Sequence, residues 1–291
     1  MLVSARHIAE LKNWAWVVVG VLQSKSIALS KVATFIPGET HAESRVTNIR
    51  CWLMNFRVDV WGFYKPVLEH ALSGWETETA NIILDGVMVG GDRWQILRLS
   101  LVHGYRAIPL IWAAVPGTGI PAMEKLEKML TQAAEFLRPR VKRVIFLADR
   151  GFRDCDWAQL CLKLGWHYNI RTAGNTYVTL KDGHSCPVDE LGVQKGERCY
   201  FQGVWLMQDV KLCANLSVTW TSGDEKHEPE LLAVMSDQCA CVARLHEYAV
   251  RMDAEESFRD DKSGGFDMAD TRLQHAERQE RLLLALEGIT R

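Results

Sequence analysis

The first 78 or so residues have apolar positions at helical spacing and predict a helical N-terminal domain, 1–78. Within it, residues 14–22 (WAWVVVGVL) form an apolar run that follows Arg6 and Lys12. The run is compatible with a buried helix or with a secretory signal, and Glu10 in the charged stretch favours the helix. No apolar run approaches the roughly 20 residues of a membrane span, so we expect no membrane association.

Two short helices are expected near Ile27–Ile36 and Glu43–Leu53, with Pro37 and Gly38 between them. The arrangement resembles a DNA-binding helix-turn-helix, but a plain helical hairpin fits equally well. Residues 1–80 carry eight basic and seven acidic side chains, so charge does not decide between the two interpretations.

From residue 81 the pattern changes to strands. Three apolar or alternating runs, with a His103-Gly104 turn before the third, predict an antiparallel meander: Asn81–Val89, Trp94–Val102 and Tyr105–Val115. Helices and strands then alternate, in the order Pro121–Leu137, Arg143–Asp149, Asp156–Leu164 and His167–Thr172. A meander followed by βα units is similar to the ribonuclease-H-like sheet.

Residues of about 174–237 contain short alternating stretches between glycines, which predict a β-rich insertion. Helices are expected again at about 242–261 and 275–286. The predicted fold is therefore α/β, a ribonuclease-H-like mixed sheet (79–291) with a β-rich insertion, preceded by the helical domain.

Composition limits the classes of function. The chain has 291 residues, of which 48% are hydrophobic, which excludes a disordered protein. With 34 basic and 36 acidic residues there is no basic excess, so a nucleic-acid partner requires a local patch such as 138–153, which has six basic residues. The eight dispersed cysteines lack a Cys-x-x-Cys pair and suggest free buried thiols in a cytoplasmic protein, with a zinc site as the alternative.

Candidate chemistry begins on the helix at 242–262. An 80° stripe of its surface collects an aromatic ring, a carboxylate and three cations: Tyr248, Arg251, Glu255, Arg259 and Lys262. A solvated charged face with a Glu255–Arg259 pair is the simpler explanation of the stripe alone.

Two aspartates belong to apolar strands. Asp85 lies inside the first strand, and Asp149 ends the strand RVIFLAD. Burying a lone carboxylate costs several kcal/mol unless a partner or a metal compensates. The alternatives are a turn residue for Asp85 and a helix cap for Asp149.

Together these residues resemble the DDE-type bacterial insertion-sequence transposases, in the group with the Tyr-x2-Arg-x3-Glu-x6-Lys signature. The matching segments are YAVRMDAEESFRDDKSGGF, LADRGF around Asp149 and RAIPLIW, with DGVMVGGDRW a looser match. The resemblance covers the chain from about residue 15 to its end.

The resemblance implies a DNA transposase that cleaves transposon ends and transfers strands into target DNA. Its catalytic, metal-binding residues would be Asp85, Asp149 and Glu255, holding two Mg²⁺ ions for which Mn²⁺ can substitute. DNA, both the terminal inverted repeats and the target, would be the partner of a homodimer synapsed on it.

The resemblance also implies DNA contacts. The cations Arg251, Lys262, Arg259 and Arg150 would meet phosphates, with Tyr248 near a 5′ phosphate. A tryptophan of the insertion, Trp220 or Trp205, would stack on a flipped base or simply pack.

One feature departs from the family. Only 29 residues follow Lys262, whereas relatives usually continue further. The alternative is therefore a truncated or non-catalytic relative that binds transposon ends and regulates a full-length transposase. A third interpretation is a ribonuclease-H-like nuclease or resolvase that does not join strands.

Overall fold

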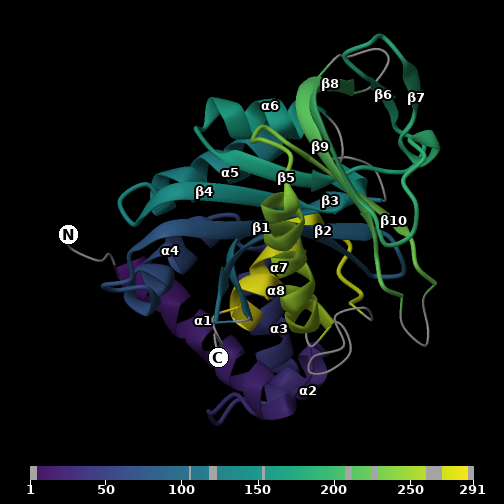
Figure 1. The fold of residues 1–291 in the computed structure, drawn as a ribbon. Helices are drawn as coiled ribbons and strands as arrows, with labels where there is room; N and C mark the ends of the chain where they lie inside the picture. Colours follow the sequence, from purple (N-terminus) through teal and green to yellow (C-terminus); the bar gives the residue numbers. More distant parts are fainter. Residues whose placement is uncertain are drawn as a thin grey trace.

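The computed structural model describes residues 5–104, 106–117, 123–152, 155–206, 212–223, 228–259 and 271–287, without the side chains of 5–7 and 252–259. Its architecture is a ten-stranded mixed sheet with helices on both faces (Figure 1). Among the helices in these ranges, none is both long and apolar enough to cross a membrane. The predicted mixed α/β class is confirmed.

The sheet begins with an antiparallel meander and continues with parallel strands. Its order from one edge is β3-β2-β1-β4-β5, in which β4 runs parallel to β1 and β5 parallel to β4. The bounds are β1 (Thr77–Val89), β2 (Trp94–His103), β3 (Arg106–Pro116), β4 (Val141–Ala148) and β5 (His167–Arg171). These strands and their antiparallel start agree with the sequence prediction.

The predicted insertion extends the same sheet beyond β5. Its strand β10 pairs antiparallel with β5, and the order continues β9-β8-β6-β7. The bounds are β6 (Tyr177–Thr179), β7 (Ser185–Pro187), β8 (Arg198–Leu206), β9 (Leu212–Trp220) and β10 (Leu231–Ser236). The β-rich character is as predicted, and β7 is a short strand that the sequence pattern did not indicate.

Eight α-helices are described: α1 (Ala5–Ser24), α2 (Leu29–Thr34), α3 (Ala42–Met54), α4 (Val60–Ala71), α5 (Met123–Leu137), α6 (Cys155–Lys163), α7 (Val242–Arg259) and α8 (Ala276–Glu287). Alternate residues of β4 show which face each helix covers. Phe146 stacks on Trp157 of α6, whereas Ile145 packs with Val250 of α7. The helices α6 and α7 therefore lie on opposite faces of the sheet (Figure 1).

The helix α8 lies among the helices on the side of the sheet that α7 covers (Figure 1). Five consecutive residues of α8, Leu282–Leu286, are buried, so the helix is covered on all sides. The N-terminal helices form part of this cover, because Trp14 Nε1 donates to the Leu284 carbonyl at 3.1 Å and Arg281 Nη1 to the Leu53 carbonyl at 2.9 Å. A domain division near residue 78 stays a prediction, and so does DNA contact by α2 and α3.

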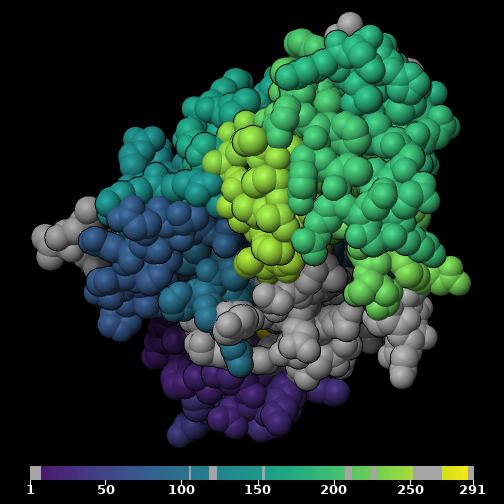
Figure 2. Space-filling view, in the orientation of Figure 1, coloured from purple at the N-terminus to yellow at the C-terminus, as the bar shows by residue number. Residues whose placement is uncertain are grey.

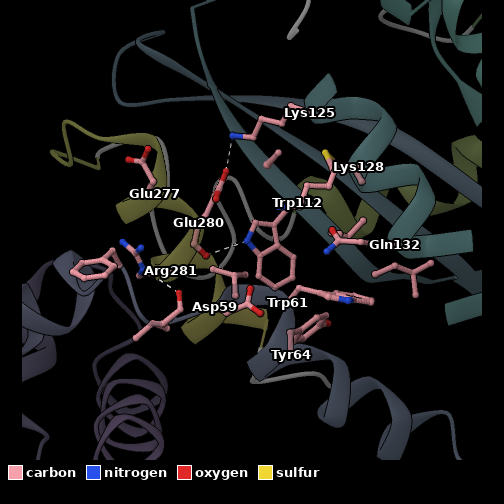
Figure 3. Close-up of a pocket in the computed structure, with 17 residues that line it drawn as sticks. Asp59, Trp61, Tyr64, Trp112, Lys125, Lys128, Gln132, Glu277, Glu280 and Arg281 are labelled. Atoms are coloured by element: carbon pink, nitrogen blue, oxygen red, sulfur yellow. Dashed lines mark hydrogen bonds and ion pairs between the residues drawn. The ribbon is translucent and has the colours of Figure 1, made fainter. Parts of the chain in front are cut away.

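Side chains from two helices bond to the edge strand β3 at one residue, Ala114. Glu280 of α8 accepts the Ala114 N–H at 2.9 Å, and Lys125 of α5 donates to the Ala114 carbonyl at 2.7 Å. Lys125 and Glu280 also pair with each other at 2.8 Å (Figure 3). Beside them, near Trp61 and Trp112, lies a cavity of about 290 Å³. The N–H and carbonyl of Ala114 are therefore hydrogen-bonded within the chain and cannot pair with a strand of another chain.

Candidate active site

The strand register brings the two predicted aspartates side by side. The last aligned pair of β1 and β4 is Leu84 with Ala148; Asp85 is the next residue of β1, and Asp149 directly follows β4. Because alternate side chains share a face, Asp85 points the same way as Ile83, and Asp149 the same way as Leu147. Ile83 and Leu147 belong to the apolar cluster that Val250 of α7 covers. Asp85 therefore faces α7, and Asp149 starts from the same face at the end of β4.

Helix α7 reaches Asp85 directly. Arg251 Nη2 lies 3.4 Å from Asp85 Oδ1, with side chains 11% and 20% exposed. In Figure 2, α7 runs down the middle of the visible face beside the green insertion strands. The part of the signature stripe that the structure describes thus meets the first aspartate and is not a wholly solvated face.

Asp149 starts a tight turn. Its Oδ1 accepts the Arg150 backbone N–H at 2.7 Å, and its carbonyl accepts that of Phe152 at 2.8 Å, at the short 3-10 helix Arg150–Phe152. The capping interpretation of Asp149 and its place beside Asp85 are therefore compatible. The bond to Arg150 fixes the orientation of the carboxylate.

The third predicted carboxylate is described only by its backbone. Glu255 lies one turn beyond Arg251 in α7, so its Cα is on the same side of the helix. The side chains of Glu255 and Arg259, and the whole of Lys262, lie outside the described residues. Among the described residues no group of three or more His, Cys, Asp or Glu could hold a metal, so the complete triad stays a prediction.

The predicted DNA contacts have different surroundings. Tyr248 is 3% exposed and packs against Val234 and Leu245, so its phenol is not presented at the surface. Arg150 has a side chain that is 57% exposed, and its Nη1 lies 3.6 Å from Glu230. An exposed guanidinium next to Asp149 is suitably placed for a phosphate, whereas Tyr248 would have to become accessible. Both roles stay predictions.

The two tryptophans of the insertion differ. The indole N–H of Trp220 donates to the Val193 carbonyl at 2.8 Å, and Lys195 Nζ lies 5.6 Å from its ring centroid. Trp205 is 44% exposed on β8. Stacking on a base needs an accessible ring face, so Trp205 is better placed for it than Trp220.

The six basic residues of 138–153 were expected to form one patch, but the described ones do not gather at the candidate site. Lys142 precedes Asp149 by seven residues, about 23 Å along a strand, at the opposite end of β4. There it pairs with Glu78, while Arg140 lies over the Phe136 ring. Lys142 is close to Asp149 in sequence, but the extended strand between them holds the two residues far apart in space. Arg153 lies outside the described residues.

The cysteine prediction is only half right. All eight thiols are free, but only Cys155, Cys161 and Cys186 are buried. The exposed ones are Cys51, Cys213 and Cys239. Cys213, for example, lies on the outward side of β9, because strand alternation turns every second side chain away from the core.

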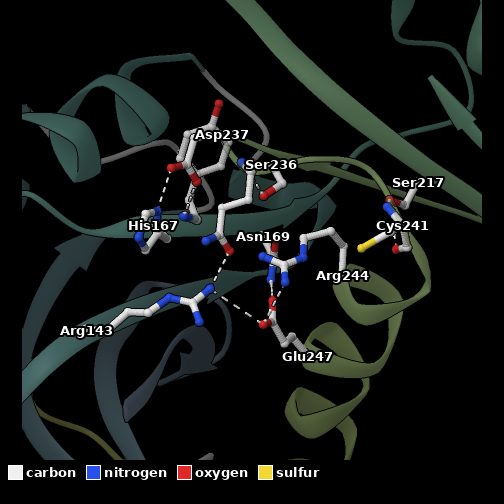
Figure 4. A network of polar contacts seen from close by, with 11 residues as sticks. Arg143, His167, Asn169, Ser217, Ser236, Asp237, Cys241, Arg244 and Glu247 are labelled. Carbon is white, nitrogen blue, oxygen red and sulfur yellow. Dashed lines mark hydrogen bonds and ion pairs between the residues drawn. The ribbon is translucent and has the colours of Figure 1, made fainter. Parts of the chain in front are cut away.

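A polar cluster that the sequence did not single out holds α7 on the sheet (Figure 4). Glu247 of α7 accepts Asn169 Nδ2 of β5 at 2.8 Å and Arg244 Nη2 at 3.0 Å, and lies 3.8 Å from Arg143 of β4. Glu247 precedes Arg251 by one helical turn, so the sequence could have indicated that Glu247 lies on the same side of the helix as Arg251.

Comparison with known proteins gives the following. No family model matches the chain, and no curated protein matches it. A piggyBac transposase, in a synaptic complex with hairpin DNA, matches with a TM-score of 0.49 and 11% identity over 96% of this chain and 63% of that one. Marinitoga piezophila Argonaute, in complex with guide RNA and target DNA, matches with a TM-score of 0.34 and 12% identity over 78% and 34%. The chain thus spans less than two thirds of either structure's length.

Proposed function

We propose that the protein is a DNA transposase of the DDE type, which cleaves transposon ends and joins them to target DNA by phosphoryl transfer. The observation that carries the proposal is the β1–β4 register, which ends at Leu84 with Ala148 and so places Asp85 and Asp149 one residue beyond the last aligned pair, with Asp85 in contact with Arg251 of α7. The order β3-β2-β1-β4-β5 supports a ribonuclease-H-like core.

The donor set fits a hard divalent cation. The carboxylates of Asp85 and Asp149 offer oxygen ligands, which Mg²⁺ prefers, and Glu255, whose backbone belongs to α7, would be the third ligand. Two bound Mg²⁺ ions, or Mn²⁺ in their place, would activate the attacking oxygen and stabilise the leaving oxygen.

The cations around this site bind the substrate. Arg251 neutralises Asp85 until DNA arrives and then contacts a phosphate, and the exposed Arg150 contacts the backbone beside Asp149. Arg259, Lys262 and Tyr248 extend this contact along the transposon end, and Trp205 or Trp220 receives a base. Two copies of the chain pair on the synapsed DNA.

The test is Mg²⁺-dependent nicking and strand transfer on a plasmid that carries the genomic DNA flanking the gene. Asp85→Asn and Asp149→Asn should each reduce cleavage about a thousandfold, a loss of about 4 kcal/mol in transition-state stabilisation, while DNA binding by fluorescence anisotropy persists. Asp182→Asn is the matched control, since its turn bond from the His184 N–H is retained by an amide oxygen.

Each contrary result has a specific meaning. DNA binding without nicking by the wild-type chain would support the regulatory relative, and nicking without joining would support a nuclease. Wild-type cleavage by either aspartate variant would remove that residue from the site.

A further inference from the structure

An acidic side chain lies among the cations at the edge of the candidate active site. Glu230, the residue before β10, contacts two arginines, one with each of its carboxylate oxygens. Its Oε1 lies 2.8 Å from Arg171 Nη2, and its Oε2 lies 3.6 Å from Arg150 Nη1. Because Arg150 directly follows Asp149, one carboxylate spans two guanidinium groups beside a proposed metal ligand.

The strand register places Arg171 at the same end of the sheet as Asp149. The aligned residues of β4 and β5 end one position before Asp149 and Arg171, so each lies one residue beyond the last pair. Because alternate side chains share a face, Arg171 points the same way as Asn169, which bonds to Glu247 of α7. Arg171 therefore lies on the face of the sheet that α7 covers, as the candidate site does.

The two partners of the closer contact are held differently. The Arg171 side chain is 15% exposed, and its Nε is buried without a hydrogen-bond partner among the described residues. The Glu230 side chain is 49% exposed, so it can turn into solvent. Its backbone stays in place meanwhile, because its N–H donates to Thr221 Oγ1 and its carbonyl accepts the Thr221 N–H, both at 2.9 Å. The carboxylate is thus the movable partner and the guanidinium the fixed one.

We propose that Glu230 is an internal competitor of DNA, whose carboxylate occupies the position of a backbone phosphate on Arg171 and Arg150 and is displaced when DNA binds. A phosphodiester also carries one negative charge and offers two oxygens to guanidinium groups. An ion pair with a half-exposed partner contributes little to stability, so a polyanion with many phosphates can displace it. The inference rests on the proposed function, since it requires DNA to pass beside Asp149.

The experiment measures the dissociation constant of the full chain for a short fluorescent duplex, taken from the DNA flanking the gene, by anisotropy at physiological salt. Glu230→Gln keeps an acceptor for Arg171 but removes the charge, and it should tighten binding about fivefold, the upper range for an exposed ion pair. Glu78→Gln is the matched control, because it removes the same charge from a pair with Lys142 at the opposite end of β4. At that distance the charge is screened, so binding should change less than about twofold.

A double-mutant cycle separates competition for Arg171 from general charge repulsion. In the Arg171→Gln background, Glu230→Gln should tighten binding less than about twofold, because the closer contact of the carboxylate is already absent. An equal gain in both backgrounds would overturn the proposal, and so would unchanged binding in Glu230→Gln alone.

If Glu230→Gln does not fold by circular dichroism, Glu230→Asp decides, because its shorter side chain withdraws the carboxylate from Arg171 at unchanged net charge. Binding about twofold tighter is expected, and unchanged or weaker binding is contrary. The nicking assay separates this inference from the proposed function. If the wild-type chain binds the duplex and its nicking depends on Asp149 while Glu230→Gln binds no tighter, only the role of Glu230 fails. If the wild-type chain does not bind the duplex, the proposed function fails as well.

Discussion

Single residues in the core show how burial sets protonation. Burial raises the pKa of the Tyr168 phenol well above its ordinary value, and the nearby charges of Asp237 and Cys161 raise it further. Its hydroxyl is buried and has no hydrogen-bond partner among the described residues. This tyrosine therefore contributes a dependence on pH without contributing a bond.

The corresponding prediction concerns alkaline stability. A folded-state pKa above the unfolded value of about 10 gives stability that is complete below pH 10 and is lost as the pH rises. Between pH 10 and 11, the free energy of unfolding of Tyr168→Phe should fall less steeply than that of the wild type, by about 1 kcal/mol over this pH unit. Urea unfolding at each pH measures this.

At pH 7 the same variant should be within about 1 kcal/mol of the wild type, because the lost hydroxyl made no bond. Parallel curves of stability against pH would show that Tyr168 ionises as readily in the folded protein as in the unfolded chain.

At the scale of one element, α7 depends on Glu247. This carboxylate contacts Asn169, which is 1% exposed, and Arg244, which is 8% exposed. If the Glu247 carboxylate were removed, Asn169 and Arg244 would each lose a hydrogen-bond partner that water cannot readily replace, because both residues are buried. Since α7 also bears Arg251, the position of Arg251 beside Asp85 depends on this anchor.

Glu247→Ala should therefore lower the free energy of unfolding by about 2–3 kcal/mol. Glu69→Ala is the control, because its pair with Lys65 on α4 is almost half exposed on both sides and should contribute less than about 0.5 kcal/mol. Urea titration compares the two. Equal losses would mean that the Glu247 cluster adds nothing beyond a surface ion pair.

The helices and strands were the features of this protein that the sequence predicted best. Apolar alternation located β1 to β5, and helical spacing located α5 to α8, because each pattern reflects a single face of burial. The pattern could not reveal that Arg98 of β2 is buried. Its strand turns Leu97, Leu99 and Leu101 to one face, and Arg98 on the other face meets Glu287 of α8, 189 residues later.

The candidate site was predictable as far as residue types go. Asp85 and Asp149 were recognisable as carboxylates in apolar strands, but their pairing depends on the β1–β4 register, which no local pattern encodes. The Arg98–Glu287 bond joins residues 189 positions apart and lay beyond any spacing argument. Hydrophobic pattern thus located the strands, and tertiary packing determined the partners.

At the scale of the whole molecule, α8 joins the N-terminal helices to the sheet. Trp14 and Arg281 bond across this junction, and Trp112 Nε1 of β3 donates to the Glu280 carbonyl at 3.0 Å on the other side of α8. A helix buried on all sides transmits the loss of packing to every layer that touches it. We expect the N-terminal helices and the sheet to unfold as one cooperative unit.

Leu284→Ala tests this expectation, because Leu284 is 0% exposed and lies between the two layers. The cavity should lower the free energy of unfolding by about 3 kcal/mol. Hydrogen exchange at rising urea, followed by mass spectrometry, gives the free energy of opening for each peptide. This free energy should decrease by the same amount in peptides from α1 and α3 as in peptides from β1 and β4. Leu162→Ala, at a position that is 50% exposed, should cost less than about 1 kcal/mol. A decrease confined to the helical peptides would instead mean that residues before β1 unfold independently, as the predicted boundary near residue 78 implies.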